Sequence, residues 1–100
     1  MKLRLSSNKT NIRISDVEWQ ILQKTGSLND VFKLSNTKTW SISLRLSDLN
    51  GYEEIEGGLF ISIDEADFKQ QKTKKDQAWQ LMTGDDFLIE VEVDFRRGLI

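Results

Sequence analysis

Ile12-Arg-Ile-Ser-Asp-Val-Glu-Trp19 has the pattern of a β-strand that runs directly into an α-helix. Apolar and polar side chains alternate up to Ser15, and Glu18 follows three residues later, which is the spacing of a helix capping box. The same pattern returns 49 residues further on as Ile61-Ser-Ile-Asp-Glu-Ala-Asp-Phe68. The chain therefore predicts two halves with the same order of elements.

A second pair of segments matches at the same offset of 49 residues. Trp40-Ser-Ile-Ser-Leu-Arg-Leu46 aligns with Ile89-Glu-Val-Glu-Val-Asp-Phe95, and the apolar side chains fall at the same places. Only two positions of the overlap are identical, Ile12 with Ile61 and Ile14 with Ile63. These identities are too few to establish a duplication, so the half-repeats 1–50 and 51–100 are a hypothesis.

Eight alternating segments and two helical segments follow from the hydrophobic pattern. The expected strands are residues 2–5, 10–14, 30–34, 39–47, 52–55, 59–63, 77–82 and 87–95, and the expected helices are about 15–25 and 64–74. Strands 39–47 and 87–95 each have one apolar and one polar face, which is typical of an antiparallel sheet with one wet side. We expect a single α+β domain over 1–100, in the order ββαββ–ββαββ with possible pseudo-twofold duplication. It would form a curved antiparallel sheet or incomplete barrel of about eight short strands with two helices.

Turn residues separate the expected elements. Gly26 can end the first helix in a left-handed conformation, and Glu56-Gly-Gly58 and Thr83-Gly-Asp-Asp86 each lie between two alternating segments. Asn50-Gly51 is the strongest short hairpin signal in the chain, because both residue types tolerate positive φ. The sequence therefore predicts a hairpin at Asn50-Gly51 as well.

The composition excludes several kinds of chemistry. The chain of 100 residues contains no cysteine and no histidine, so disulfides, thiolate metal sites and the usual catalytic triads are excluded. No motif for a cofactor is present, and we expect none. The amino terminus lacks the apolar run of a signal peptide, and no stretch approaches the roughly 20 apolar residues of a membrane helix. We therefore expect a soluble cytoplasmic protein.

The charges are distributed unevenly between the halves. Residues 1–50 carry eight Lys and Arg against four Asp and Glu, whereas residues 51–100 carry six against twelve. One interpretation is that both halves simply have solvated charged faces. The other is that the halves attract each other within the chain or between subunits.

Four short segments together carry a family resemblance. They are Met1-Lys-Leu-Arg-Leu5, Asn11-Ile-Arg-Ile-Ser15 with the helix that ends at Thr25-Gly26, Leu59-Phe-Ile-Ser-Ile-Asp-Glu-Ala66, and the strand ending Val93-Asp-Phe95. They resemble a family of small uncharacterised bacterial proteins that open Met-Lys-Ile-Arg-Ile. The function of that family is unknown, so the resemblance supplies no site residues.

The last expected strand carries a row of carboxylates. Glu90, Glu92 and Asp94 lie on one face at intervals of roughly 7 Å, and such a row could hold Mg²⁺ or Ca²⁺. The alternative is a solvated sheet face that is paired with Arg13 or Arg45 on neighbouring strands.

Two further groups of residues are candidates for interaction. Four lysines around the end of the second helix could contact phosphates or an acidic partner: Lys69, Lys72, Lys74 and Lys75. Their alternative role is a solvated helix and loop. Trp19 and Trp79 could anchor a protein interface, or pack in the core. The alternation that begins at Trp40 predicts that Trp40 is buried.

These observations favour a non-enzymatic module that binds a protein partner or a second copy of itself. Nucleic acid is disfavoured because no wholly basic surface is expected, and a membrane is not expected either. One alternative is a small-ligand-binding barrel, with divalent-metal-dependent phosphohydrolase chemistry at the row of carboxylates. A second alternative is an immunity or antitoxin-like protein, which rests on small size and charge.

Overall fold

The computed structural model describes residues 1–73, 78–84 and 86–94, and for residues 70–73 it describes the backbone only. The elements are β1 Lys2–Leu5, β2 Lys9–Ser15, α1 Asp16–Thr25, β3 Ser27–Lys33, β4 Thr39–Ser47, β5 Gly51–Ile55, β6 Gly58–Asp64, α2 Glu65–Thr73, β7 Trp79–Thr83 and β8 Phe87–Asp94. This is the expected order, and each element lies within a few residues of its expected bounds. The fold is α+β.

The strands form two four-stranded sheets, which corrects the expectation of one curved antiparallel sheet or incomplete barrel. Sheet A has the order β1-β2-β8-β7, and sheet B has the order β3-β4-β6-β5. The outer pairs of each sheet are antiparallel hairpins, but the central pairs β2–β8 and β4–β6 are parallel. Strands with one apolar and one polar face therefore do not require a fully antiparallel sheet. In each sheet a central parallel pair joins two antiparallel hairpins, and one face of the sheet stays exposed to solvent.

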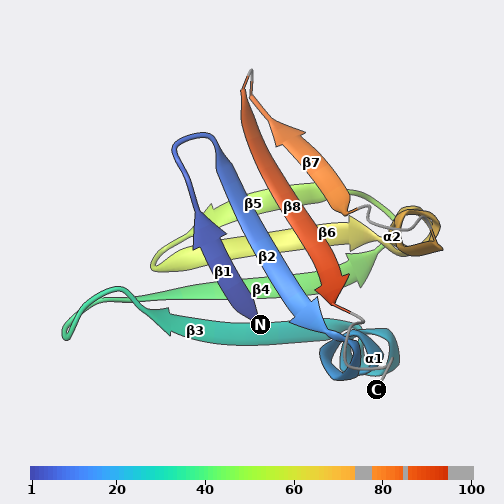
Figure 1. Ribbon diagram of the computed structural model, residues 1–100, viewed down its shortest axis with the longest axis horizontal. Helices are drawn as coiled ribbons and strands as arrows, with labels where there is room; N and C mark the ends of the chain where they lie inside the picture. Colours follow the sequence, from blue (N-terminus) through green and yellow to red (C-terminus); the bar gives the residue numbers. More distant parts are fainter. Residues whose placement is uncertain (74–77, 85, 95–100) are drawn as a thin grey trace.

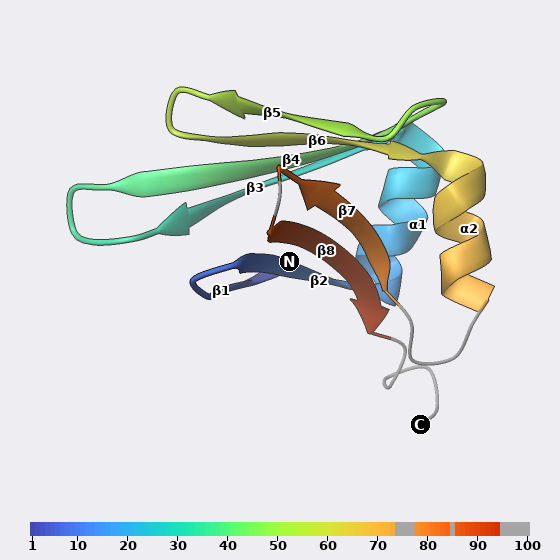
Figure 2. The same cartoon turned by 90° about the horizontal axis from the view of Figure 1, so that it is seen from above.

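The two sheets pack face to face, and their strands cross at a steep angle (Figure 1). Both helices lie across one end of this sandwich and connect the two layers (Figure 2). The hairpin of β3 and β4 extends beyond sheet A at the other end (Figure 2). The two helices therefore close the sandwich at one end, and no described helix covers the other end.

A single core fills the space between the sheets and the helices. Its buried side chains are Ile12, Ile14, Trp19, Leu22, Ile42, Leu44, Leu59, Ile61, Ile63, Phe68, Trp79, Ile89 and Val91. The strand members alternate with outward residues, as the period-two pattern requires, and these are mostly polar, with Phe60 between Leu59 and Ile61 as an exception. Burial of each such large side chain stabilises the fold by about 1.5–3 kcal/mol.

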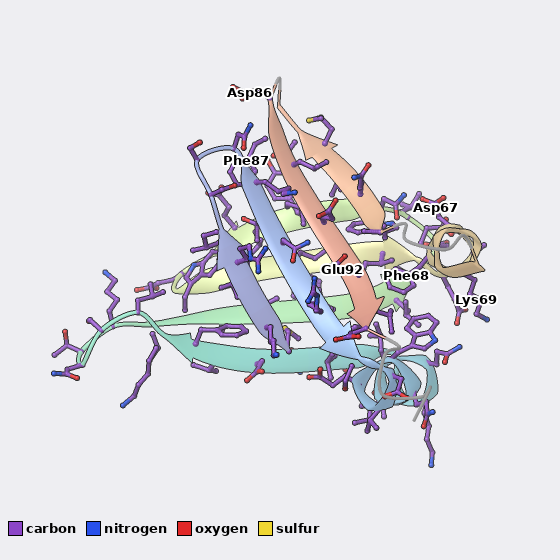
Figure 3. The ribbon with its side chains drawn as sticks, viewed as in Figure 1. Asp67, Phe68, Lys69, Asp86, Phe87 and Glu92 are labelled. Atoms are coloured by element: carbon purple, nitrogen blue, oxygen red, sulfur yellow. The ribbon has the colours of Figure 1, made fainter. Side chains whose placement is uncertain are left out.

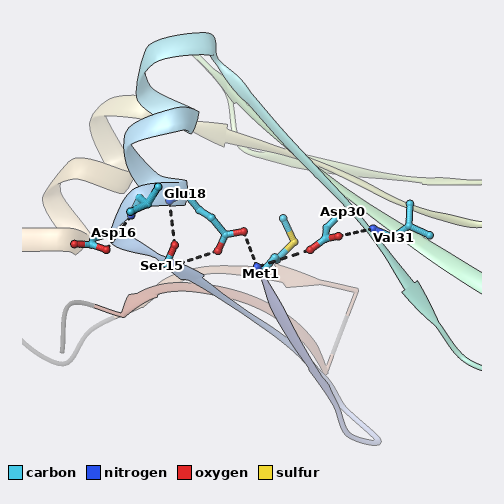
Figure 4. A network of polar contacts seen from close by, with 7 residues as sticks. Met1, Ser15, Asp16, Glu18, Asp30 and Val31 are labelled. Atoms are coloured by element: carbon cyan, nitrogen blue, oxygen red, sulfur yellow. Dashed lines mark hydrogen bonds and ion pairs between the residues drawn. The ribbon is translucent and has the colours of Figure 1, made fainter. Parts of the chain in front are cut away.

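The first helix begins at the predicted capping box. The backbone N–H of Glu18 donates to the Ser15 hydroxyl, and the backbone N–H of Ser15 donates to the Glu18 carboxylate. The Met1 ammonium reaches the same carboxylate at 2.5 Å and lies 3.8 Å from Asp30 (Figure 4). The helix ends at Gly26, whose φ of 84° is one that glycine adopts without strain.

The second helix begins with a similar network in which Asn50 has the place of Met1. Asp64 accepts from the backbone N–H of Asp67, and the Asn50 amide donates to the Asp67 carboxylate at 2.9 Å. The Asn50 carbonyl also accepts from the backbone N–H of Asp64 and from the Trp79 indole. Met1 and Asn50 are related by the offset of 49, as are Glu18 and Asp67. The similarity of the two halves at the offset of 49 therefore extends to the polar contacts at the start of both helices.

Strand order and register are equivalent in the two halves. Exchange of the halves turns the order of sheet A into that of sheet B, because β1 and β2 correspond to β5 and β6. Leu3 pairs with Ile12 in the first hairpin, and Tyr52 pairs with Ile61 at the same offset of 49. Ile12 in turn pairs with Val91 just as Ile61 pairs with Leu44.

This register corrects two expectations from the sequence. β4 corresponds to β8 at an offset of 47, so Leu44 matches Val91, and the alignment of these strands at 49 is wrong by one inward position. The hairpin expected at Asn50-Gly51 is also wrong. That dipeptide joins β4 to β5, which lie on opposite sides of β6 and do not pair.

Candidate functional site: a cleft between the sheets

A cleft of about 450 Å³ opens between the two sheets. It is lined by the first residues of all four central strands, among them Thr10 of β2, Trp40 of β4, Leu59 of β6 and Phe87 of β8. β2 and β6 run from this end toward the helices, so the cleft lies at the end of the sandwich opposite to α1 and α2. Figure 3 shows Phe87 far from Phe68 of α2. Its volume is within the range of small-molecule sites.

The cleft has an apolar body with a few polar groups. Its apolar walls include Trp40, Leu59, Phe87 and Ile89. Its polar lining comes from both sheets and from the β3–β4 turn, and consists of Thr10, Lys38, Thr39, Tyr52, Glu54 and Thr83. Apolar walls with a small number of polar groups are the usual composition of a site that orients a small organic ligand.

Thr10 is the most unusual of these polar residues. Its exposed fraction is only 3%, and it is the one polar residue among the fully buried residues of the described chain. Its hydroxyl makes no hydrogen bond with any described residue. The hydroxyl oxygen itself is not fully enclosed and opens to the cleft, so water or a ligand can bind it there.

Several polar residues of the cleft occupy positions where the equivalent residue of the other half is apolar. Five inward strand positions are polar in one half and apolar in the other. One of them, Asp30 matching Leu81, lies outside the cleft and near the Met1 ammonium. The other four supply the polar lining of the cleft: Thr10 matches Leu59, Tyr52 matches Leu3, Glu54 matches Leu5, and Thr83 matches Phe32. A core that served stability alone would not require these four exchanges. They all concentrate polar groups in one cleft.

The length of one hairpin also differs between the halves. Residues 33–39 separate the facing pair Phe32 and Trp40, whereas only residues 84–86 separate the equivalent pair Thr83 and Phe87. The longer hairpin of β3 and β4 extends past the edge of sheet A (Figure 2), and its residues Lys38 and Trp40 line the cleft. Trp40 is therefore half-buried instead of buried, because it lies at the open end of the sandwich.

The carboxylates of β8 lie on the outer face of sheet A, away from this cleft. Arg13 binds Glu92 through Nε at 2.9 Å and Nη2 at 2.8 Å, and Glu92 is labelled on this face in Figure 3. Arg13 is thus the partner that the sequence suggested, whereas Arg45 belongs to the other sheet. In the part of the chain that the structure describes, no group of three or more carboxylates is placed to share a metal ion. The row with Glu90 and Asp94 is a charged sheet face here.

Glu90 has a dense set of partners on the same face. The amides of Asn11 and Gln80 donate to its two oxygens at 2.7 and 2.9 Å, and the Lys9 ammonium lies 3.5 Å away. Burial raises the pKa of Glu90, but the hydrogen bonds from Gln80 and Asn11 and the charge of Lys9 outweigh it, so the pKa lies below its ordinary value of 4.5. The basic first half and the acidic second half therefore meet across β2 and β8.

Trp19 and Trp79 are buried in the core, with exposed fractions of 2% and 1%. The Trp19 ring stacks on Phe68 with centroids 4.7 Å apart, and the Trp79 indole donates to Asn50. Neither ring is accessible to a partner. Of the two alternatives that the sequence left open, Trp19 and Trp79 pack in the core and do not anchor an interface.

The lysines do not form a described cluster. Lys69 is exposed and pairs with Glu65 one turn earlier at 3.7 Å. Lys72 belongs to α2, but its side chain is not described, and Lys74 and Lys75 lie outside the described residues. A phosphate-binding role for these lysines stays a prediction.

Within the described residues, no helix has the length and apolar character needed to cross a membrane. No protein-family model, characterised protein or solved structure matches the chain. The resemblance to small bacterial proteins stays a prediction, and the site has to be interpreted from its own geometry.

The sequence interpretation missed the cleft, although part of its signal was present. When the two halves are aligned at the offset of 49, Thr10 aligns with Leu59 and Leu5 aligns with Glu54. Exchanges of this kind on an inward face mark positions where packing is not the only requirement. The exchange of Phe32 for Thr83 could not be found in this way, because its offset is 51.

Proposed function

We propose that this protein is a binding module for a small amphipathic molecule, which it holds in the cleft between the two sheets. The single observation that carries the proposal is Thr10, an almost fully buried residue that lines the cleft and whose hydroxyl makes no hydrogen bond with any described residue. In this proposal the two halves are an internal duplication. The ligand site is marked by the polar residues Tyr52, Glu54 and Thr83 of the second half and by Thr10 of the first, whose equivalents are all apolar.

The lining favours a ligand with a flat apolar body and a polar end. The rings of Trp40 and Phe87 provide large apolar surface for the body. The hydroxyls of Thr10 and Thr83 can bind a hydroxyl or carbonyl group, and Glu54 offers a carboxylate for a hydroxyl or an ammonium. Tightness would come from apolar burial, and selectivity from these polar groups.

The cleft supports binding better than catalysis. Glu54 is the one carboxylate among the described residues of the lining, and the chain has no histidine or cysteine to act as a general base or nucleophile. The phosphohydrolase alternative placed its chemistry on the row of β8, which faces away from the cleft. The immunity or antitoxin alternative gains no supporting observation.

Three probes with the same ring test this proposal: tryptophol, tryptamine and indole-3-acetate. Each is titrated into ¹⁵N-labelled protein, and amide shifts are followed. We expect saturable shifts at Thr10, Thr83 and Ile89 for at least one probe, with tryptamine weakened by Glu54→Gln. The paired variant Thr10→Leu and Thr83→Phe, which installs the apolar residues of the equivalent positions, should abolish these shifts.

A matched control is Met82→Ala, which changes an exposed side chain of β7 outside the cleft lining. Its shifts on titration should equal those of the original chain. The proposal fails if none of the three probes shifts cleft amides at about millimolar concentration, or if the shifts persist in the variant with both apolar replacements.

A further inference from the structure

The outer face of sheet B differs sharply from that of sheet A. Sheet A presents seven charged side chains outward: Lys2, Arg4, Lys9, Arg13, Glu90, Glu92 and Asp94. Sheet B presents mainly serines, glycines and a few apolar side chains, and no described helix covers it, because α1 and α2 lie at the end of the sandwich (Figure 2). The serines and glycines of this face lose little solvation when they are covered, and its row positions include two charged side chains, Arg45 and Glu53.

The strand register arranges this face in rows across all four strands. The rows are Val31-Ser41-Gly58-Ile55, Asn29-Ser43-Phe60-Glu53 and Ser27-Arg45-Ser62-Gly51, each written in the order β3, β4, β6, β5. In the middle row the aromatic ring of Phe60 lies beside the short side chain of Ser43. Val31 and Ile55 are exposed by 62% and 41% at the two edges.

We propose that this face of sheet B pairs with the same face of a second copy of the chain, about a twofold axis parallel to the strands and between β4 and β6. Such an axis places β4 over β6 of the second copy and keeps each row opposite itself. Phe60 then lies over the small Ser43 of the other copy, and Val31 lies over Ile55. Each bulky group meets a small or apolar one, which is the self-complementarity of an isologous interface.

Charge complementarity supports the same arrangement. Arg45 and Glu53 are both exposed, and neither forms an ion pair with a described residue. On the proposed axis, Arg45 of each copy lies over Ser62 of the other, diagonally next to Glu53. Two equivalent Arg45–Glu53 pairs would form at once, and these side chains are long enough to close such a diagonal.

The size of the face predicts a weak dimer. Four strands at a spacing of about 4.8 Å and three rows about 7 Å apart cover roughly 19 Å by 20 Å. That is about half of the roughly 800 Å² that each partner buries in a standard stable interface. The dissociation constant should therefore be micromolar or weaker, and the dimer should depend on protein concentration.

Sedimentation equilibrium between about 10 μM and 1 mM tests the proposal. The mass should rise from the 11.6 kDa of one chain toward twice that value. Ser43→Lys should weaken association at least tenfold, because its position faces Phe60 of the other copy. Met82→Lys on the outer face of sheet A is the matched control and should not change the association.

The charge pair gives a second readout that does not depend on packing. Arg45→Glu and Glu53→Arg should each weaken the dimer severalfold, and the chain with both exchanges should recover it. The proposal is overturned by a mass that stays at one chain up to 1 mM, by a dimer that Ser43→Lys leaves unchanged, or by a double exchange that does not recover.

Discussion

The two halves of this chain share strand order, register and helix-start contacts, but they differ in polarity where they meet. The first half supplies apolar side chains at Leu3, Leu5 and Phe32, where the second half has Tyr52, Glu54 and Thr83. At one cleft position the exchange is reversed, because the first half has Thr10 where the second half has Leu59. The shared features account for the fold, and the differences account for the cleft.

The contact of equivalent aromatic residues should be the largest single source of stability that the comparison identifies. Trp19 and Phe68 are related by the offset of 49 and stack on each other in the core. Trp19→Ala and Phe68→Ala should each lower the free energy of unfolding by about 3–5 kcal/mol. Urea unfolding of both variants measures this.

The doubly substituted chain should lose less than the sum of the two single losses, since both variants remove one shared contact. Val17→Ala on the exposed face of α1 is the control and should change stability by less than about 0.5 kcal/mol. Strict additivity would contradict the view that the two helices are joined through this pair.

A second position where the halves differ is Gly58, whose equivalent is Lys9. A Cβ atom at Gly58 would lie 2.3 Å from both the backbone oxygen and the side-chain oxygen of Ser41 on β4. Gly58→Ala should therefore cost about 1–3 kcal/mol through overpacking. Lys9→Ala removes only a partly exposed ion pair and should cost about 1 kcal/mol or less. Thermal unfolding of the two variants compares them directly, and equal losses would contradict the close approach of β4 and β6.

Much of this fold could be predicted from the sequence, because local patterns determine it. The capping box at Ser15 and the left-handed Gly26 set the bounds of α1, and alternation located the described strands, although β3 begins at Ser27, three residues before its expected start. The pairing of the strands could not be predicted in the same way. An Asn50-Gly51 dipeptide looks like a hairpin turn, but its Asn50 side chain is instead required at the start of α2. The division into two sheets depends on which hairpins become parallel neighbours, and no local signal specifies that.

The two helix starts differ in how they are tied to the rest of the chain. Asn50 has three side-chain hydrogen bonds, to Asp64, Asp67 and Trp79. Asn50→Ala removes all three, so it should cost about 1–3 kcal/mol, in the range for groups left without partners. Glu18→Gln keeps the shape of the first helix start and should cost less. Denaturant unfolding of both variants ranks the two effects, and the reverse order would contradict the central role of Asn50.

The acid dependence of stability should be a smaller effect and should involve both halves. Burial raises the pKa of Glu18, but hydrogen bonds from the Met1 ammonium and Ser15 hold it below its ordinary value of 4.5, as the partners of Glu90 do for that residue. A lowered pKa stabilises the fold above the unfolded value, and this stabilisation is lost as the pH falls through the folded pKa. Melting temperatures should be flat between about pH 5 and 7 and fall below about pH 4.5. The chain with Glu18→Gln and Glu90→Gln should show a weaker fall, and an unchanged fall would exclude these two carboxyls as its cause.

The central claim is that the polar groups of the cleft serve a ligand and not the fold, and Thr10→Val tests it most directly. Valine has the shape of threonine and suits a strand, but it lacks the hydroxyl that finds no partner among the described residues. Urea unfolding of the ligand-free chain should show no loss of stability for Thr10→Val, because the hydroxyl makes no hydrogen bond with a described residue. A loss of about 1 kcal/mol or more would mean that the hydroxyl stabilises the fold itself, and it would contradict the assignment of the cleft as a binding site.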